Sequence, residues 1–95
     1  MEVKVRFFTT LREALGRKEE RVGLPDGSTV SDLLASLTAE HGRIFEEYVF
    51  DRDTGKPAAY LSFLLDGVSI SSSKGLETKL NDGSTVAIIP PVGGG

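Results

Sequence analysis

Alternate residues at the start of the chain are apolar, from Glu2 to Phe8. A spacing of two places them on one face of an extended backbone: Val3, Val5 and Phe7. The residues between them are charged, so this pattern predicts a half-buried strand. Phe8 then adds an aromatic ring to the polar face.

A short helix and a second strand are expected next. Residues 9–15 read as a helical turn that a threonine caps and Gly16 ends. Val22 and Leu24 are again spaced by two, which predicts a strand from Lys18 to Leu24. The short connection favours an antiparallel hairpin between the two strands.

The strongest helical pattern lies between two glycine-containing turns. Thr29 can cap a helix, and Asp32 completes an approximate capping box. Gly42 is a suitable end, so the helix is expected from Val30 to His41. Its apolar residues recur at helical spacing and form one stripe: Val30, Leu33, Leu34 and Leu37.

The second half of the chain predicts three more strands. Tyr60 to Leu65 is the most apolar run, and Asp66-Gly67 turns it back into a short strand around Val68 and Ile70. Residues 71–75 are expected to be loop, and Thr85 to Ile89 is the last strand. Residues 43–50 are mixed in character and can cover the open end of the core, whereas residues 51–57 read as an acidic loop.

This order of elements predicts an α+β fold of the β-grasp (ubiquitin-like) type. In that fold a mixed sheet of four to five strands carries one long helix on one face. The first and last strands pair in parallel at its centre. We expect a folded domain over residues 1–89 and a tail over residues 90–95.

Composition narrows the class of protein. The chain has 95 residues, a net charge of -3 and no cysteine. A single small domain without a basic cluster argues against nucleic acid and anionic membranes as partners. Disulfides and thiolate chemistry are excluded. No apolar run reaches transmembrane length and no signal peptide is seen, so a cytoplasmic protein is expected.

Three features suggest metal or nucleophilic chemistry but favour structural roles. His41 is the only histidine, and no second histidine or cysteine exists to share a metal. We therefore expect no metal site and a role for His41 at the helix end. The Asp-x-Asp-x-Gly sequence at residues 51–55 departs from a calcium loop, and the serines at 71–73 have no nearby base in sequence.

The last residues have an unusual composition. Pro90 and Pro91 favour an extended exit and cannot continue a sheet ladder. Val92 and three glycines follow, Gly93, Gly94 and Gly95. Glycines lose much conformational freedom on ordering, so we expect a flexible arm that presents a carboxylate.

Strand alternation also predicts an apolar patch. Phe8, Leu64 and Ile89 fall on the sheet face away from the helix, if strands one, five and three are neighbours. The patch would dock a partner beside the arm, with Arg12 at its rim. The alternative is that residues 43–57 fold over it.

These stretches together resemble the MoaD/ThiS family of sulfur carriers, relatives of ubiquitin, and most closely its molybdopterin synthase branch. The resemblance rests on residues 5–16, on Asp66-Gly67, and on residues 75–95 with their Pro-Pro-Val-x-Gly-Gly ending. It implies that a ubiquitin-activating-type adenylyltransferase uses ATP to adenylate Gly95. A sulfur donor then forms a thiocarboxylate, and the large subunit of molybdopterin synthase uses that sulfur.

The resemblance further implies that the chain is a non-catalytic carrier subunit with no cofactor of its own. It would be a monomer alone and part of a hetero-oligomer with its partner. The arm from Pro90 to Gly93 would bind the partner, and Gly94 must lack a side chain. Two alternatives remain: a ubiquitin-like modifier conjugated through Gly95 to lysines, or a sulfur carrier for thiazole (thiamine) or cysteine synthesis.

Overall fold

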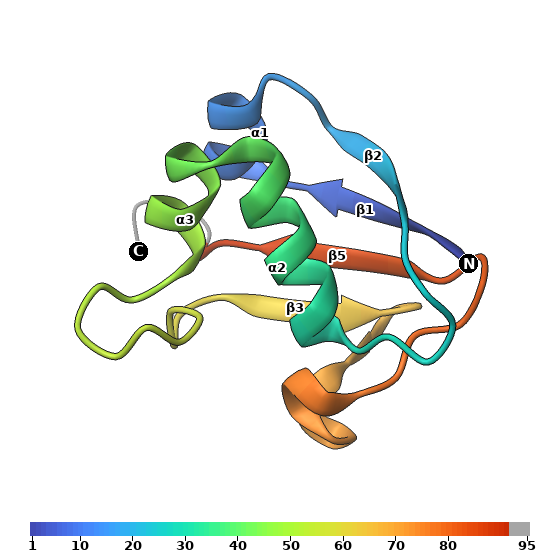
Figure 1. Ribbon diagram of the computed structural model, residues 1–95. Helices are drawn as coiled ribbons and strands as arrows, with labels where there is room; N and C mark the ends of the chain where they lie inside the picture. The colour runs from blue at the N-terminus through green and yellow to red at the C-terminus, as the bar shows by residue number, and fades with distance from the viewer. Residues whose placement is uncertain (92–95) are drawn as a thin grey trace.

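A mixed five-stranded sheet is the framework of the computed structural model, which describes residues 1–91. The strand order is β2-β1-β5-β3-β4. β1 (Glu2–Phe7) and β5 (Thr85–Ile89) are parallel neighbours at the centre, although they come from opposite ends of the described chain. Figure 1 shows α2 (Val30–His41) lying across one face of this sheet. The predicted β-grasp fold is confirmed.

The first two strands pair as expected, with a helix between them. β2 (Glu19–Gly23) is antiparallel to β1, with Val3 opposite Val22. α1 (Thr9–Leu15) ends at Gly16, whose φ of 72° is the left-handed conformation that glycine adopts most easily. The predicted threonine cap of α1 is wrong. Phe8 holds the cap position in an extended conformation, without a side-chain hydrogen bond.

α2 begins and ends where its sequence predicts. The Thr29 hydroxyl accepts a hydrogen bond from the Asp32 amide, and the Asp32 carboxylate accepts one from the Thr29 amide, which completes a capping box. The apolar stripe is fully buried: Val30, Leu33, Leu34 and Leu37. Burial of this stripe against the sheet is what fixes the helix on that face.

A third helix occupies the segment whose structure the sequence left undecided. α3 (Arg43–Val49) starts directly after α2, at Gly42. Phe45 and Val49 are both 0% exposed, whereas Ile44 and Tyr48 face solvent. The segment therefore closes the core, as expected, and does so as a helix.

β3 (Ser62–Leu65) is shorter than predicted, and Asp66-Gly67 turns the chain into β4 (Val68–Ser69). Both turn residues have positive φ, 49° and 86°, as a tight hairpin turn requires. The expected loop after β4 instead contains two short 3₁₀ helices, η1 (Ile70–Ser72) and η2 (Gly75–Glu77). Buried Ile70 anchors the first of them.

One hydrophobic core lies between the sheet and the helices. It includes residues from β1, β5, α2 and α3, and Val5, Ile88, Leu37 and Phe45 are completely buried in it. Over residues 1–91, no helix combines the length and apolarity needed to cross a membrane. The core occupies the side of the sheet that faces the helices. The side chains on the opposite face are therefore not part of this core.

Candidate functional site: the outer sheet face and the chain exit

The exit of the chain lies at the end of the central strand. β5 ends at Ile89, after which Pro90 is buried and Pro91 is exposed. The body of the protein therefore extends through Pro90. The positions assigned to the arm from Val92 to Gly95, including Gly93 and Gly94, lie outside the described residues, and their predicted roles stay predictions.

The predicted apolar patch is assembled by the register of three strands. β5 alternates between buried and partly exposed residues, so Ala87 and Ile89 share the outer face. Ala87 pairs with Leu64 of β3, and Ile88 pairs with Phe7, directly before Phe8. Phe8, Leu64 and Ile89 are all partly exposed. They form one apolar group beside the chain exit.

Arg6 fixes the side on which the Phe8 ring lies. The Arg6 guanidinium carbon is 5.3 Å from the centre of the Phe8 ring, in a cation–π contact. Arg6 is exposed on the outer face, so the ring is there too. Arg12 is exposed on α1, the helix that follows Phe8 directly, as its predicted place at the rim requires.

The alternative, that residues 43–57 fold over this patch, does not fit the fold. Phe45 and Val49 of α3 belong to the same core as Val5 and Ile88, so α3 lies on the α2 side of the sheet. Phe50 also packs against that core. In the loop that follows, the Asp51 carboxylate accepts hydrogen bonds from the Asp53 and Thr54 amides, which is turn chemistry.

Charged residues occupy the half of the outer face that β1 and β2 form, where they make diagonal pairs. Lys4 lies 3.7 Å from Glu19, and Arg21 lies 3.5 Å from Glu2, across β1 and β2. The four side chains are between 39% and 69% exposed, so solvent screens these pairs and they stabilise the fold little. They make this half of the outer face polar and confine the apolar surface to the end nearest the exit.

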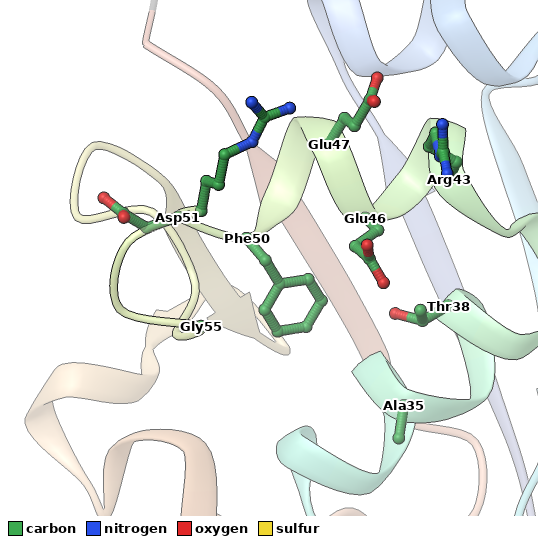
Figure 2. Close-up of a pocket in the computed structure, with 9 residues that line it drawn as sticks. Ala35, Thr38, Arg43, Glu46, Glu47, Phe50, Asp51 and Gly55 are labelled. Atoms are coloured by element: carbon green, nitrogen blue, oxygen red, sulfur yellow. The ribbon is translucent and has the colours of Figure 1, made fainter.

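A cavity of about 720 Å³ lies on the helix side of the sheet, between α2, α3 and the following loop. Figure 2 shows the Phe50 ring, the Glu46 carboxylate and the Thr38 hydroxyl facing this space. Arg43 and Arg52 line it as well, next to acidic residues. These opposite charges do not converge on a common point, so the cavity indicates no class of ligand.

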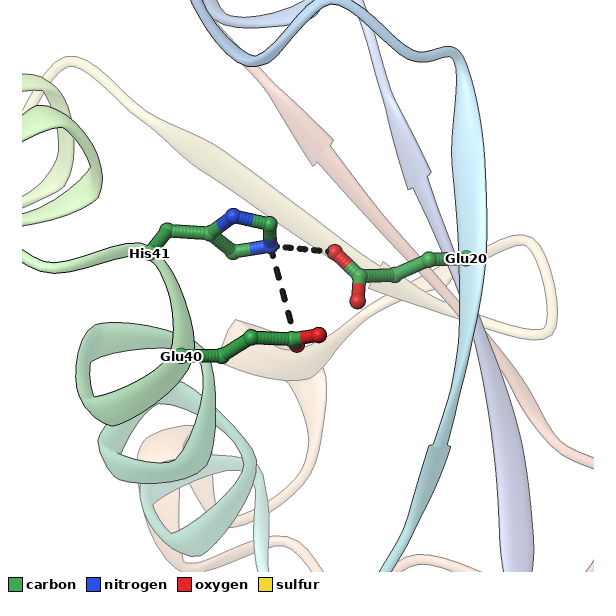
Figure 3. A group of neighbouring side chains, drawn as sticks. All are labelled: Glu20, Glu40 and His41. Carbon is green, nitrogen blue, oxygen red and sulfur yellow. Dashed lines mark hydrogen bonds and ion pairs between the residues drawn. The ribbon is translucent and has the colours of Figure 1, made fainter.

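The structure also brings together residues that sequence reasoning did not connect. The His41 Nε2 atom lies 2.5 Å from Glu20 Oε1 and 3.7 Å from Glu40 Oε2 (Figure 3). Glu20 comes from β2, and the other two residues end α2. The contact between Glu20 and His41 spans 21 positions. An acidic residue in a strand at such a distance carries no signal in a single sequence.

Comparison with known proteins identifies the family. Residues 5–95 match the ThiS family. The chain is 36% identical over 99 residues to small archaeal modifier protein 3 of Haloferax volcanii, with all of both chains covered. It is 32% identical over 95 residues to the molybdopterin synthase sulfur carrier subunit of Chlamydomonas reinhardtii, again with all of both chains covered.

A solved structure agrees with both sequence comparisons. The crystal structure of small archaeal modifier protein 1 from Haloferax volcanii superimposes with a TM-score of 0.88 and 28% identity, over all of both chains. Its fold is therefore that of this chain, from the first strand to the last. On the family match and the full-length identity together, the chain belongs to the ThiS family of ubiquitin-like sulfur carriers.

Proposed function

We propose that this protein carries sulfur as a thiocarboxylate on Gly95 and delivers it for molybdopterin synthesis, as the small subunit of molybdopterin synthase. The observation that carries this proposal is the apolar group of Phe8, Leu64 and Ile89 at the end of β5, from which the chain continues to Gly95. A partly exposed apolar group beside the chain exit suits a protein partner. The full-length relative in Chlamydomonas reinhardtii is such a subunit.

The chemistry requires activation of a poor electrophile. A carboxylate resists attack by sulfur, and adenylation gives it a leaving group. In the proposed sequence a Gly95 oxygen attacks the α-phosphate of ATP and releases pyrophosphate. A nucleophilic sulfur donor then displaces AMP. Both steps occur in the active site of an adenylyltransferase of the ubiquitin-activating type, and the large synthase subunit later takes the sulfur.

The partner-facing residues have separate roles in this proposal. The patch docks the body of the protein, with Arg12 at its rim, and Pro91 starts the arm in an extended direction. Val92 and Gly93 continue the arm, and Gly94, which has no side chain, can pass through a slot too narrow for other residues. The carrier itself supplies no catalytic side chain.

A second candidate function rests on a specific observation. The relative with 36% identity is a modifier protein, and its alignment covers all of both chains. Conjugation would begin with the same Gly95 adenylate, but a lysine amine would attack it and form an isopeptide bond. Carriage for thiazole or cysteine synthesis has weaker support, because the sulfur carrier protein CysO of Mycobacterium tuberculosis is 28% identical to this chain over 95 residues.

The decisive experiment incubates the protein with ATP, a sulfur donor and the activating enzyme of its own organism. Intact mass spectrometry should show replacement of one oxygen by one sulfur at Gly95. Addition of the large synthase subunit and the pyranopterin precursor should then consume the thiocarboxylate. A modifier would instead yield lysine conjugates, and sulfur that the synthase subunit cannot use would contradict the molybdopterin assignment.

Extending the chain beyond Gly95 gives the sharpest test of the reacting atom. One alanine after Gly95 should abolish the thiocarboxylate, because the only free α-carboxylate then belongs to the added residue. Circular dichroism should be unchanged, since the core lies within residues 1–91. Sulfur found on the extended chain, without cleavage of the added residue, would refute the role of Gly95.

A further inference from the structure

Three side chains with metal-binding atoms converge at the end of α2, on the helix side of the sheet. One ligand atom each from Glu20, Glu40 and His41 lies within 4.8 Å of the other two. Figure 3 shows both carboxylates directed at the Nε2 atom of the imidazole. β2 supplies one of the three residues and α2 supplies the other two.

Two of these side chains are held in place by their surroundings. The Glu20 and His41 side chains are only 6% and 13% exposed. The imidazole is edge-on to Phe7 and tilted against Phe45, with 6.4 Å between ring centres in each case. These aromatic contacts fix the direction in which Nε2 points. The Glu40 side chain is 52% exposed and leaves the cluster open to solvent on one side.

Little fixed positive charge lies near the two carboxylates. The Arg17 guanidinium is 3.9 Å from Glu20, and the Arg17 side chain is 50% exposed. The pKa of Glu40 is raised because its carboxyl can share a hydrogen bond with Glu20, because it loses solvation and because it feels the Glu20 charge. The charges of His41 and Arg17 oppose this rise.

We propose that Glu20, Glu40 and His41 bind a divalent transition metal ion, and that Zn²⁺ is the ion they suit best. Zinc takes imidazole nitrogen together with carboxylate oxygen and accepts three protein ligands with a water in the fourth position. The nitrogen ligand disfavours calcium and magnesium, which prefer oxygen. The ion would replace the proton on Nε2 and neutralise both carboxylates.

This inference revises the sequence-based expectation of no metal site. That expectation considered only a second histidine or a cysteine as the partner of His41. The fold supplies carboxylates instead, one of them from a strand 21 positions away. A bound ion would join β2 to the end of α2, so it would stabilise the fold in proportion to its occupancy.

Titration calorimetry with Zn²⁺ tests the proposal on the intact protein. We expect one ion per chain, and a proton release that calorimetry detects as heat depending on the buffer, because Nε2 must be free of its proton. Glu40→Gln and His41→Gln should each weaken binding by ~10-fold or more, because loss of a ligand costs at least as much as loss of an outer-shell partner. Glu47→Gln is the matched control, because it removes an exposed carboxylate outside the cluster and should leave the affinity unchanged.

Thermal unfolding gives an independent measure of zinc binding. The melting temperature of the wild-type protein should rise with zinc concentration, and that of Glu40→Gln should rise much less. Glu40 is exposed, so this variant keeps the fold even if a change at buried Glu20 does not. Absence of a zinc-dependent rise at millimolar zinc would overturn the proposal. Equal affinities for the wild type, Glu40→Gln and His41→Gln would also overturn it.

Discussion

Contacts of single side chains hold the edge strand β2 against the end of α2. Glu20 is a nearly buried carboxylate in β2, and the imidazole of His41 is its closest partner. Removing one member of such a pair leaves the other buried without a partner. The resulting loss of folding free energy is larger than the net stability that the intact pair contributes. Glu40 adds a second negative charge at the negative end of α2, where the helix dipole already disfavours it.

Glu40→Gln should therefore stabilise the metal-free protein near neutral pH. The folded state raises the pKa of Glu40 above its ordinary value of 4.5, so folding disfavours the charged form. Well below pH 4.5 the carboxyl is protonated in both the folded and the unfolded state, and the substitution should change stability little. As pH rises through the folded pKa, the wild type loses stability that the glutamine variant keeps.

Urea unfolding in the presence of EDTA at acidic and neutral pH measures this effect. The difference in unfolding free energy between the two proteins should grow as pH rises. An equal difference at both pH values would show that the charge of Glu40 is not its cause.

The two helices α2 and α3 differ in how much of their stability comes from local sequence features and how much from tertiary contacts. α2 has a capping box at its start and one continuous apolar stripe, so its bounds follow from local pattern. α3 has seven residues and no side-chain cap. A helix of that length is marginal in isolation, and burial of Phe45 and Val49 stabilises it.

Leu34→Ala tests how much the buried apolar stripe of α2 contributes to the free energy of unfolding. Leu34 is 2% exposed in the core, and its truncation should cost ~2–5 kcal/mol of unfolding free energy. That is a large share of the ~5–15 kcal/mol typical of a domain. Ile44→Ala is the control, because Ile44 is 52% exposed and should lose much less. Chemical denaturation measures the unfolding free energy of both variants. Similar losses of stability in the two would contradict the burial of Leu34.

The sequence predicts elements whose signals are local and misses those that depend on contacts. β1, α2 and β5 follow from period and capping, and their bounds agree with prediction to within one residue. The helical form of α3 and the 3₁₀ turns after β4 depend on buried Phe45, Val49 and Ile70. The predicted threonine cap of α1 is wrong because Phe8, in an extended conformation, holds the cap position and makes no side-chain hydrogen bond.

The whole molecule presents two unlike sheet faces. One face is covered by α2 and α3, and the other keeps its apolar side chains only near the exit of β5. Alternation predicted the outward direction of Leu64 and Ile89, because the side-chain period of a strand is independent of its distant neighbours. The Glu20–His41 contact could not be predicted in the same way, since it depends on how β2 and α2 meet in space.

Phe8→Ala and Ile89→Ala should weaken binding to the large synthase subunit. Each should cost ~1–3 kcal/mol of binding free energy, as truncated anchors at an interface do. Stability should change little, because both side chains lie outside the core. Val68→Ala is the matched control, since Val68 is 60% exposed on the edge strand β4. Titration calorimetry compares the three variants, and unchanged affinity for both patch variants would eliminate the patch as the docking surface.

The parallel pairing of β1 with β5 has a consequence for how the protein is made. The centre of the sheet needs residues 85–89, which are synthesised long after residues 2–7. While the chain emerges from the ribosome, Val3, Val5 and Phe7 therefore lack their central neighbour until β5 has been made. A pairing so distant in sequence forms late and slows folding. A chain that stops before β5 cannot complete the sheet, so one edge of its β1 remains unpaired.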